Sequence, residues 1–188
     1  MKKAIGRSAL SALGWTLGYE NPLTDRYVLA VAPHTSNWDF PLGLMAAWAL
    51  ELDAHWIGKH TLFKGPLGPF FRSVGGIPVD RGAARDMVEQ MAERFAREER
   101  LVLALAPEGT REGSDHWKSG FWRIARAAEV PIALAYLDWG RRELGLGGTF
   151  MPTDDREADF ARIRAFYADR QGRFPEKQGE IRPRGTRH

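Results

Sequence analysis

The sequence predicts an α/β domain built on a largely parallel mixed sheet flanked by helices. Three short runs that are apolar throughout predict strands buried on both faces, at Tyr27–Ala32, Leu101–Ala106 and Pro131–Leu137. Segments with helical periodicity separate these runs, and strands that alternate with helices are typical of parallel sheets. Because no internal repeat or linker divides the 188 residues, we expect a single domain over residues 1–188.

The first 25 residues predict a short amphipathic helix that lies on the surface. Three leucines fall on one side of a helix over residues 4–19, and three glycines weaken that pattern. Lys2, Lys3 and Arg7 make this end of the chain basic. An anionic surface such as a membrane would attract it, and ordinary solubilising charge is the alternative interpretation.

Helices and strands alternate through the rest of the chain. The clearest helix covers residues 83–100, where Met87, Met91 and Phe95 recur on one face. Residues 171–188 are rich in glycine, proline and arginine, which predicts a loop or a basic tail. The other expected elements are a helix at 38–52, a short strand at 54–58 and helices at 117–128 and 155–169.

Composition excludes several classes of protein. The chain has no cysteine, which excludes a disulfide scaffold, a thiolate metal site and a cysteine nucleophile. Its five histidines lack zinc-binding spacing, so we expect no metal. The longest apolar stretch, Phe40–Leu50, is about half of the roughly 20 residues that a membrane-spanning helix needs. The protein is therefore expected to meet a membrane only at its surface.

Charge is distributed unevenly along the chain. The net charge is +3, yet residues 170–188 alone hold six Lys or Arg against two Glu. A basic end suits an anionic partner, either a membrane or a nucleic acid. The basic residues are not interleaved with aromatic residues on strands, and no RNA-binding signature occurs, so we expect no nucleic-acid partner.

The first of three polar segments follows the predicted strand at 27–32. His34 comes just after this strand, and Asp39 lies five residues later in the first turn of the expected helix. The carboxylate can therefore reach one ring nitrogen and stabilise the imidazolium while the other nitrogen accepts a proton. The alternative is a loop histidine beside a helix-capping aspartate.

The other two segments offer groups that bind phosphate. Gly75–Arg81 combines two glycines with the planar guanidinium of Arg81, although a glycine turn followed by arginine is common. Pro107–Arg111 follows the strand at 101–106, and an ordinary strand-to-loop turn would also explain it. Its polar groups are the carboxylate of Glu108, a free backbone amide at Gly109, the hydroxyl of Thr110 and the guanidinium of Arg111.

The order and spacing of the three segments resemble the glycerolphosphate/lysophosphatidate acyltransferase family. HxxxxD at 34–39, GxIPVDR ending at Arg81 and PEGTR at 107–111 carry the resemblance. Val130-Pro131-Ile132 lies where the family has a fourth, hydrophobic block. The resemblance extends over residues 26–140, which is most of the chain.

This resemblance implies the fold of that family and an acyl transfer. The acyl group would pass from a thioester of coenzyme A or acyl carrier protein to a hydroxyl of a lysophospholipid-like acceptor such as 1-acylglycerol 3-phosphate. His34 would be the general base and Asp39 its orienting partner. The thioester is a co-substrate, so no cofactor is expected, and the protein would be cytoplasmic, peripheral at the inner membrane face. Acceptor binding would fall to Arg81, Glu108, Gly109, Thr110, Arg111 and Lys118.

The chemistry of the residues agrees with direct transfer. A thioester is already activated, so attack by an alcohol needs a base but no enzyme nucleophile. The alternative is a non-catalytic lipid- or acyl-carrier-binding module of the same fold, which would need neither His34 nor Asp39. Glu112 replaces a small hydroxyl residue of the family pattern and places a negative charge beside the expected phosphate site. Aromatic candidates for lipid contact, with core packing as the alternative, are Trp15, Phe63, Phe70 and Phe71.

Overall fold

The computed structural model describes residues 1–19, 24–79 and 84–183. Its strands are β1 (Thr16–Tyr19), β2 (Arg26–Ala32), β3 (Ala54–Lys59), β4 (Gly76–Val79), β5 (Leu101–Leu105), β6 (Ile132–Asp138) and β7 (Glu143–Phe150). Its helices are α1 (Lys2–Ala12), α2 (Asp39–Ala49), α3 (Gly68–Ser73), α4 (Ala84–Arg97), α5 (Gly120–Ala127) and α6 (Arg156–Tyr167). Two short 3₁₀ helices are η1 (His60–Phe63) and η2 (Pro175–Lys177).

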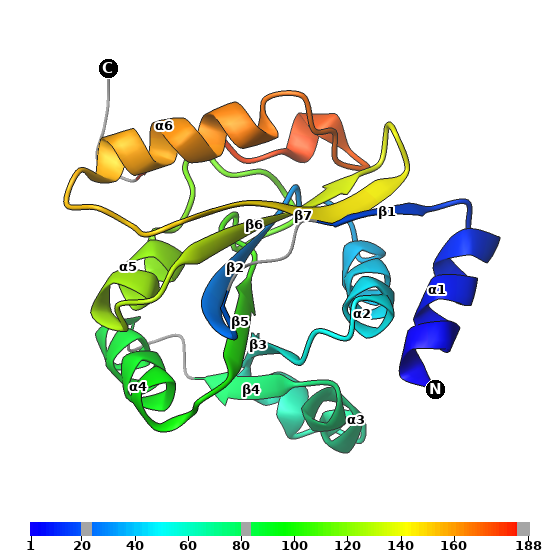
Figure 1. Ribbon diagram of the computed structural model, residues 1–188, viewed down its shortest axis with the longest axis horizontal. Coiled ribbons are helices and arrows are strands. Elements are labelled where there is room, and N and C mark those ends of the chain that lie inside the picture. Colours follow the sequence, from blue (N-terminus) through cyan, green and yellow to red (C-terminus); the bar gives the residue numbers. More distant parts are fainter. Residues whose placement is uncertain (20–23, 80–83, 184–188) are drawn as a thin grey trace.

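The seven strands form one sheet in the order β1-β7-β6-β2-β5-β3-β4 (Figure 1). Neighbouring strands are parallel from β6 to β4, whereas β7 pairs antiparallel with β6 and carries β1 parallel to itself. The prediction of a largely parallel mixed sheet flanked by helices is confirmed. Because β2, β3 and β5 run in the same direction, the loops that follow them lie at one edge of the sheet.

Strand β2 separates two apolar layers. Val28 and Ala30 point into the larger core, which includes buried side chains of α4, α5 and α6. Tyr27 and Leu29 alternate to the opposite face. Figure 1 shows α4 and α5 on one side of β2 and β5, and α2 and α1 on the other. Burial on both faces explains why the sequence of this strand is apolar without interruption.

Helix α1 packs on α2 through a glycine. A Cβ atom at Gly6 would lie 2.5 Å from the carbonyl oxygen of Met45, so only glycine lets the two helices approach this closely. Leu10 is buried in the same contact, while Ile5 and Leu13 stay exposed. The glycine that weakened the helical pattern in the sequence is thus required by the packing.

Several elements differ from those expected. The sequence did not predict β1, β4, β7 or α3, and α5 begins at Gly120 rather than at residue 117. Trp15 and Phe63 are buried and belong to the core, whereas Phe70 is exposed. Within the described ranges, every helix is too short or too polar to cross a bilayer.

The segment after α6, expected to be a loop or tail, returns across the sheet edge, and its regular structure is η2 and a β-bridge between Pro183 and Trp117. We call residues 170–183 the C-terminal strap. Gln171 accepts a hydrogen bond from the backbone amide of Trp139 (2.7 Å), and the amide of Glu180 donates to the carbonyl of Ser114 (2.9 Å). The strap therefore contacts the loops that follow both β5 and β6.

Candidate active site

His34 lies in the tight loop between β2 and α2. Its Nδ1 is 3.4 Å from Oδ2 of Asp39, and its side chain is 22% exposed. The ring is thus accessible from solvent on one side and faces a carboxylate on the other. This is the juxtaposition that the spacing of the two residues predicts.

Asp39 is buried and accepts hydrogen bonds on both oxygens. Its Oδ2 accepts from the backbone amides of Thr35 and Ser36, each at 2.8 Å, and its Oδ1 accepts from Nε1 of Trp139 at 2.9 Å. These three donors fix the position of the carboxylate. The aspartate therefore closes the loop before α2 and faces His34 at the same time, so the two interpretations of the sequence are compatible.

Glu108 contacts the His34 loop from the interior of the protein and is 2% exposed. Its Oε1 accepts from the backbone amide of His34 (2.6 Å), and its Oε2 accepts from the amide of Gly179 in the C-terminal strap (3.0 Å). Burial raises the pKa of the Glu108 carboxyl, and the hydrogen bonds from the two amides oppose that rise. The carboxylate thus joins β5, the His34 loop and the strap, and its expected contact with the acceptor stays a prediction.

The turn after Glu108 is built around a glycine. Gly109 has φ +67°, and a Cβ there would lie 2.7 Å from the Nζ of Lys118, so the lysine side chain crosses the turn at this point. The prediction of a free backbone amide at Gly109 is wrong, because this amide donates to the carbonyl of Ala106 (3.1 Å). Thr110 accepts a hydrogen bond from the amide of Glu112 (3.2 Å). Lys118 is therefore adjacent to the turn.

A surface cleft of about 330 Å³ opens between three segments. Residues 35–38 form one wall, Arg111 and Glu112 form the second, and Arg173, Phe174 and Lys177 of the strap form the third. The structure thus brings the His34 loop and the 107–111 turn together, as expected. Arg81 lies outside the described residues.

Neither Trp139 nor the two strap cations that line the cleft were predicted as site residues from the sequence. Trp139 follows β6 directly, so the rule that directed attention to the ends of β2 and β5 would also have found it. The strap is visible in the sequence only as an excess of basic residues. Among residues 1–19, 24–79 and 84–183, no group of three or more His, Asp or Glu side chains could hold a metal ion.

The family model described as Acyltransferase matches residues 17–136, a range that contains both the His34 loop and the 107–111 turn. The chain belongs to the acyltransferase family. A comparison of this acyltransferase with curated proteins found no match.

The acyltransferase also resembles a solved structure. The crystal structure of PlsC from Thermotoga maritima, a 1-acyl-sn-glycerophosphate acyltransferase, matches with a TM-score of 0.56 and 21% identity. The match covers 89% of this chain and 74% of that chain. It confirms the expected acyltransferase-like fold.

Proposed function

We propose that the protein is an O-acyltransferase in which His34 is the general base. The acyl donor is a thioester of coenzyme A or acyl carrier protein, and the acceptor is a lysophospholipid such as 1-acylglycerol 3-phosphate. The observation that carries the proposal is the accessible ring of His34, 3.4 Å from the buried carboxylate of Asp39, beside a cleft lined by cations.

The proton moves through one nitrogen of His34. Nδ1 faces Oδ2 of Asp39, which leaves Nε2 to accept the proton of the acceptor hydroxyl. The hydroxyl oxygen attacks the thioester carbon, the carbon–sulfur bond breaks, and the imidazolium returns the proton to the leaving thiolate. The products are an ester and a free thiol. Asp39 stabilises the imidazolium between these steps.

The acceptor class is supported by the charges around the cleft. The cleft is lined by three positive side chains, Arg111, Arg173 and Lys177, and by one negative side chain, Glu112. Its net positive charge favours an anionic headgroup. The acyltransferase that this structure resembles acts on 1-acyl-sn-glycerophosphate according to its name. A phosphorylated lysolipid therefore suits the cleft better than a neutral one.

Release of free thiol from acyl-CoA in the presence of a panel of lysolipids tests the proposal. His34→Ala should lower kcat about 10²–10⁴-fold, because the variant lacks the base. His116→Ala is the matched control: its Nδ1 is 2.6 Å from Asp115 and its side chain is 23% exposed, but it does not line the cleft.

Three outcomes decide between the interpretations. Thiol release that depends on His34 and not on His116 supports the enzyme. Equal turnover in a folded His34→Ala variant would overturn the assignment of the base. Tight lipid binding by the wild type without thiol release would instead support the non-catalytic lipid- or acyl-carrier-binding module.

We also propose that the protein works at a membrane surface, at the inner face of the cytoplasmic membrane. Leu62, Leu67 and Phe70 are exposed on η1, α3 and the turn between them. These elements follow the carboxyl end of β3, at the same sheet edge as His34, and exposed Lys59 and Lys64 accompany them. An apolar patch with a basic rim suits an anionic bilayer. Sedimentation with anionic vesicles should fall for Leu67→Ser/Phe70→Ser and not for Met151→Ser, an exposed residue beyond β7.

A further inference from the structure

The strap brings two cations to the wall of the cleft opposite the His34 loop. The amide of Phe174 donates to Oγ1 of Thr35, the residue after His34, at 3.2 Å. The guanidinium of Arg173 lies 4.9 Å from the ring centroid of Trp139, whose Nε1 holds Asp39. One indole thus separates a strap cation from the carboxylate that faces His34.

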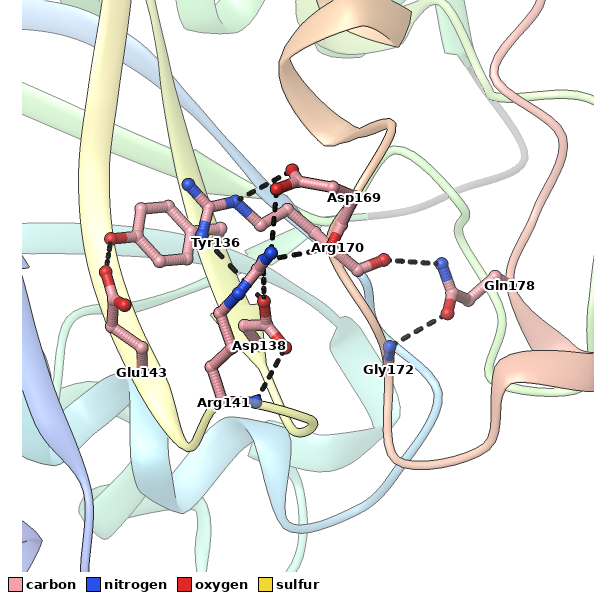
Figure 2. Close-up of polar contacts among 8 residues, drawn as sticks. All are labelled: Tyr136, Asp138, Arg141, Glu143, Asp169, Arg170, Gly172 and Gln178. Carbon is pink, nitrogen blue, oxygen red and sulfur yellow. Dashed lines mark hydrogen bonds and ion pairs between the residues drawn. The ribbon is translucent and has the colours of Figure 1, made fainter.

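An ionic cluster fixes the strap where it leaves α6 (Figure 2). Asp138, 1% exposed at the end of β6, lies 2.8 Å from Nη1 of Arg141 and 3.8 Å from Nη1 of Arg170. Arg141 also binds Asp169 at 3.0 Å, and Arg170 lies over the ring of Tyr136. These contacts with the buried carboxylate of Asp138 hold the start of the strap in one position.

The next turn of the strap is closed by a single side chain. Gln178 donates to the carbonyl of Arg170 (3.2 Å) and accepts from the amide of Gly172 (2.8 Å), as Figure 2 shows. A Cβ at Gly172 would lie 2.8 Å from Oγ1 of Thr35, so the strap touches the His34 loop closely at this point. Arg173 and Lys177 lie between these two fixed ends and are therefore pre-positioned.

Lys177 also compensates the negative charge of Glu112, the residue that departs from the family pattern. Its Nζ lies 3.1 Å from Glu112, the carboxylate beside Arg111. With that charge compensated, the lining of the cleft keeps an excess of two positive charges, from three cations and one carboxylate. The strap thus restores the anion-binding character that Glu112 would otherwise weaken.

We propose that Arg173 and Lys177 of the strap, together with Arg111, bind the phosphate monoester of the substrate. This inference rests on the proposed function. Both an acyl-acceptor headgroup and coenzyme A carry phosphate monoesters. In 1-acylglycerol 3-phosphate the attacking hydroxyl and the phosphate are on adjacent carbons, so the phosphate must bind close to His34. The strap residues next to Thr35 and Trp139 meet that requirement, which assigns the site to the acceptor.

Steady-state kinetics of Arg173→Gln/Lys177→Gln test the assignment. With 1-acylglycerol 3-phosphate the acceptor KM should rise at least about tenfold, because two charge-assisted contacts are lost. With monoacylglycerol, which lacks the phosphate, the KM should not change, nor should the KM for acyl-CoA. The control Arg97→Gln/Arg123→Gln removes the same charge from exposed positions on α4 and α5 that do not line the cleft.

Two further variants separate binding from folding. Glu112→Gln should lower the acceptor KM a few-fold, because it releases Lys177 from its ion pair. Arg173→Lys/Lys177→Arg keeps both charges and should recover most of the affinity. Equal losses with phosphorylated and unphosphorylated acceptors would show a merely structural strap and overturn the proposal, as would a rise confined to the KM for acyl-CoA.

A binding measurement distinguishes failure of this inference from failure of the proposed function. Glycerol 3-phosphate should raise the Tm of the wild type, and glycerol should not, whereas the Arg173→Gln/Lys177→Gln variant should respond to neither. If that pattern holds without any thiol release, the phosphate site stands and the acyl transfer fails. If glycerol 3-phosphate stabilises both proteins equally, the strap site is refuted.

Discussion

Helices α2 and α6 each have in their first turn a buried aspartate that accepts a hydrogen bond from a tryptophan indole, and only the aspartate of α2 faces a histidine. Asp39 in the first turn of α2 accepts from the indole of Trp139 and from two backbone amides. Asp159 in the first turn of α6 accepts from the indole of Trp122 (2.8 Å) and the amide of Thr153 (2.7 Å). Each is 3% exposed. The remaining partner of Asp39 is His34, whereas that of Asp159 is the hydroxyl of Thr153. Burial and capping therefore do not by themselves distinguish a carboxylate that faces a histidine from one that does not.

The largest expected effect is a difference in kcat between variants of these two aspartates. Asp39→Asn should lower kcat about 10²–10⁴-fold, because an amide does not stabilise the imidazolium of His34. Asp159→Asn should leave kcat unchanged. Each variant loses one accepting oxygen and should cost about 1–3 kcal/mol of unfolding free energy. Thiol release and urea denaturation measure the two quantities, and equal rate losses in both variants would contradict the distinction.

Substitution of the indoles of Trp139 and Trp122 should also give a difference in turnover, but a smaller one. Trp139→Phe and Trp122→Phe each remove the N–H that a buried carboxylate accepts, so each should cost about 1–3 kcal/mol of stability. Only Trp139→Phe should slow turnover, by less than about tenfold, since Thr35 and Ser36 still hold Asp39. A Trp122→Phe variant that slowed turnover equally would show that the rate follows stability alone.

A third buried carboxylate, Glu108, gives the smallest effect, and it depends on pH. Burial raises the pKa of the Glu108 carboxyl, so the folded protein binds its proton more tightly than the unfolded chain. Its contribution to stability is fully present below the unfolded-state pKa and is lost as pH rises through the folded-state pKa. The wild type should therefore lose stability as pH rises across this window, whereas Glu108→Gln has no titrating group at this position. The unfolding free energy of the wild type minus that of the variant should fall accordingly. Denaturation at a series of pH values measures it, and a difference that grew with pH would contradict the assignment.

The sequence predicted the parts of the fold that are buried on both faces. The apolar runs became β2, β5 and β6 because parallel strands covered by helices need apolar residues throughout. Strand β7 was missed because it contains three glycines. A Cβ at Gly145 would lie 2.2 Å from the carbonyl oxygen of Gly18, so glycine is needed where β7 and β1 approach. Strand β4 was missed because Pro78 weakens a strand pattern, and it is tolerated here on an edge strand.

In the candidate site, contacts between residues close in the sequence could be predicted, whereas contacts between distant residues could not. His34 and Asp39 are five residues apart, so the spacing alone placed the carboxylate beside the ring. Phe174 and Thr35 are 139 residues apart in the sequence, and Gly179 and Glu108 are 71 apart. No periodicity or motif encodes contacts of that length, so the strap was visible only as an excess of charge.

The position of the strap in the chain has a consequence for biosynthesis. During translation the segments that form β2, β5 and β6 leave the ribosome before residues 170–183. A nascent chain can therefore complete its central sheet and its histidine loop while one wall of the cleft is still missing. Cleavage by a protease just after α6 would likewise remove Arg173 and Lys177 from the cleft.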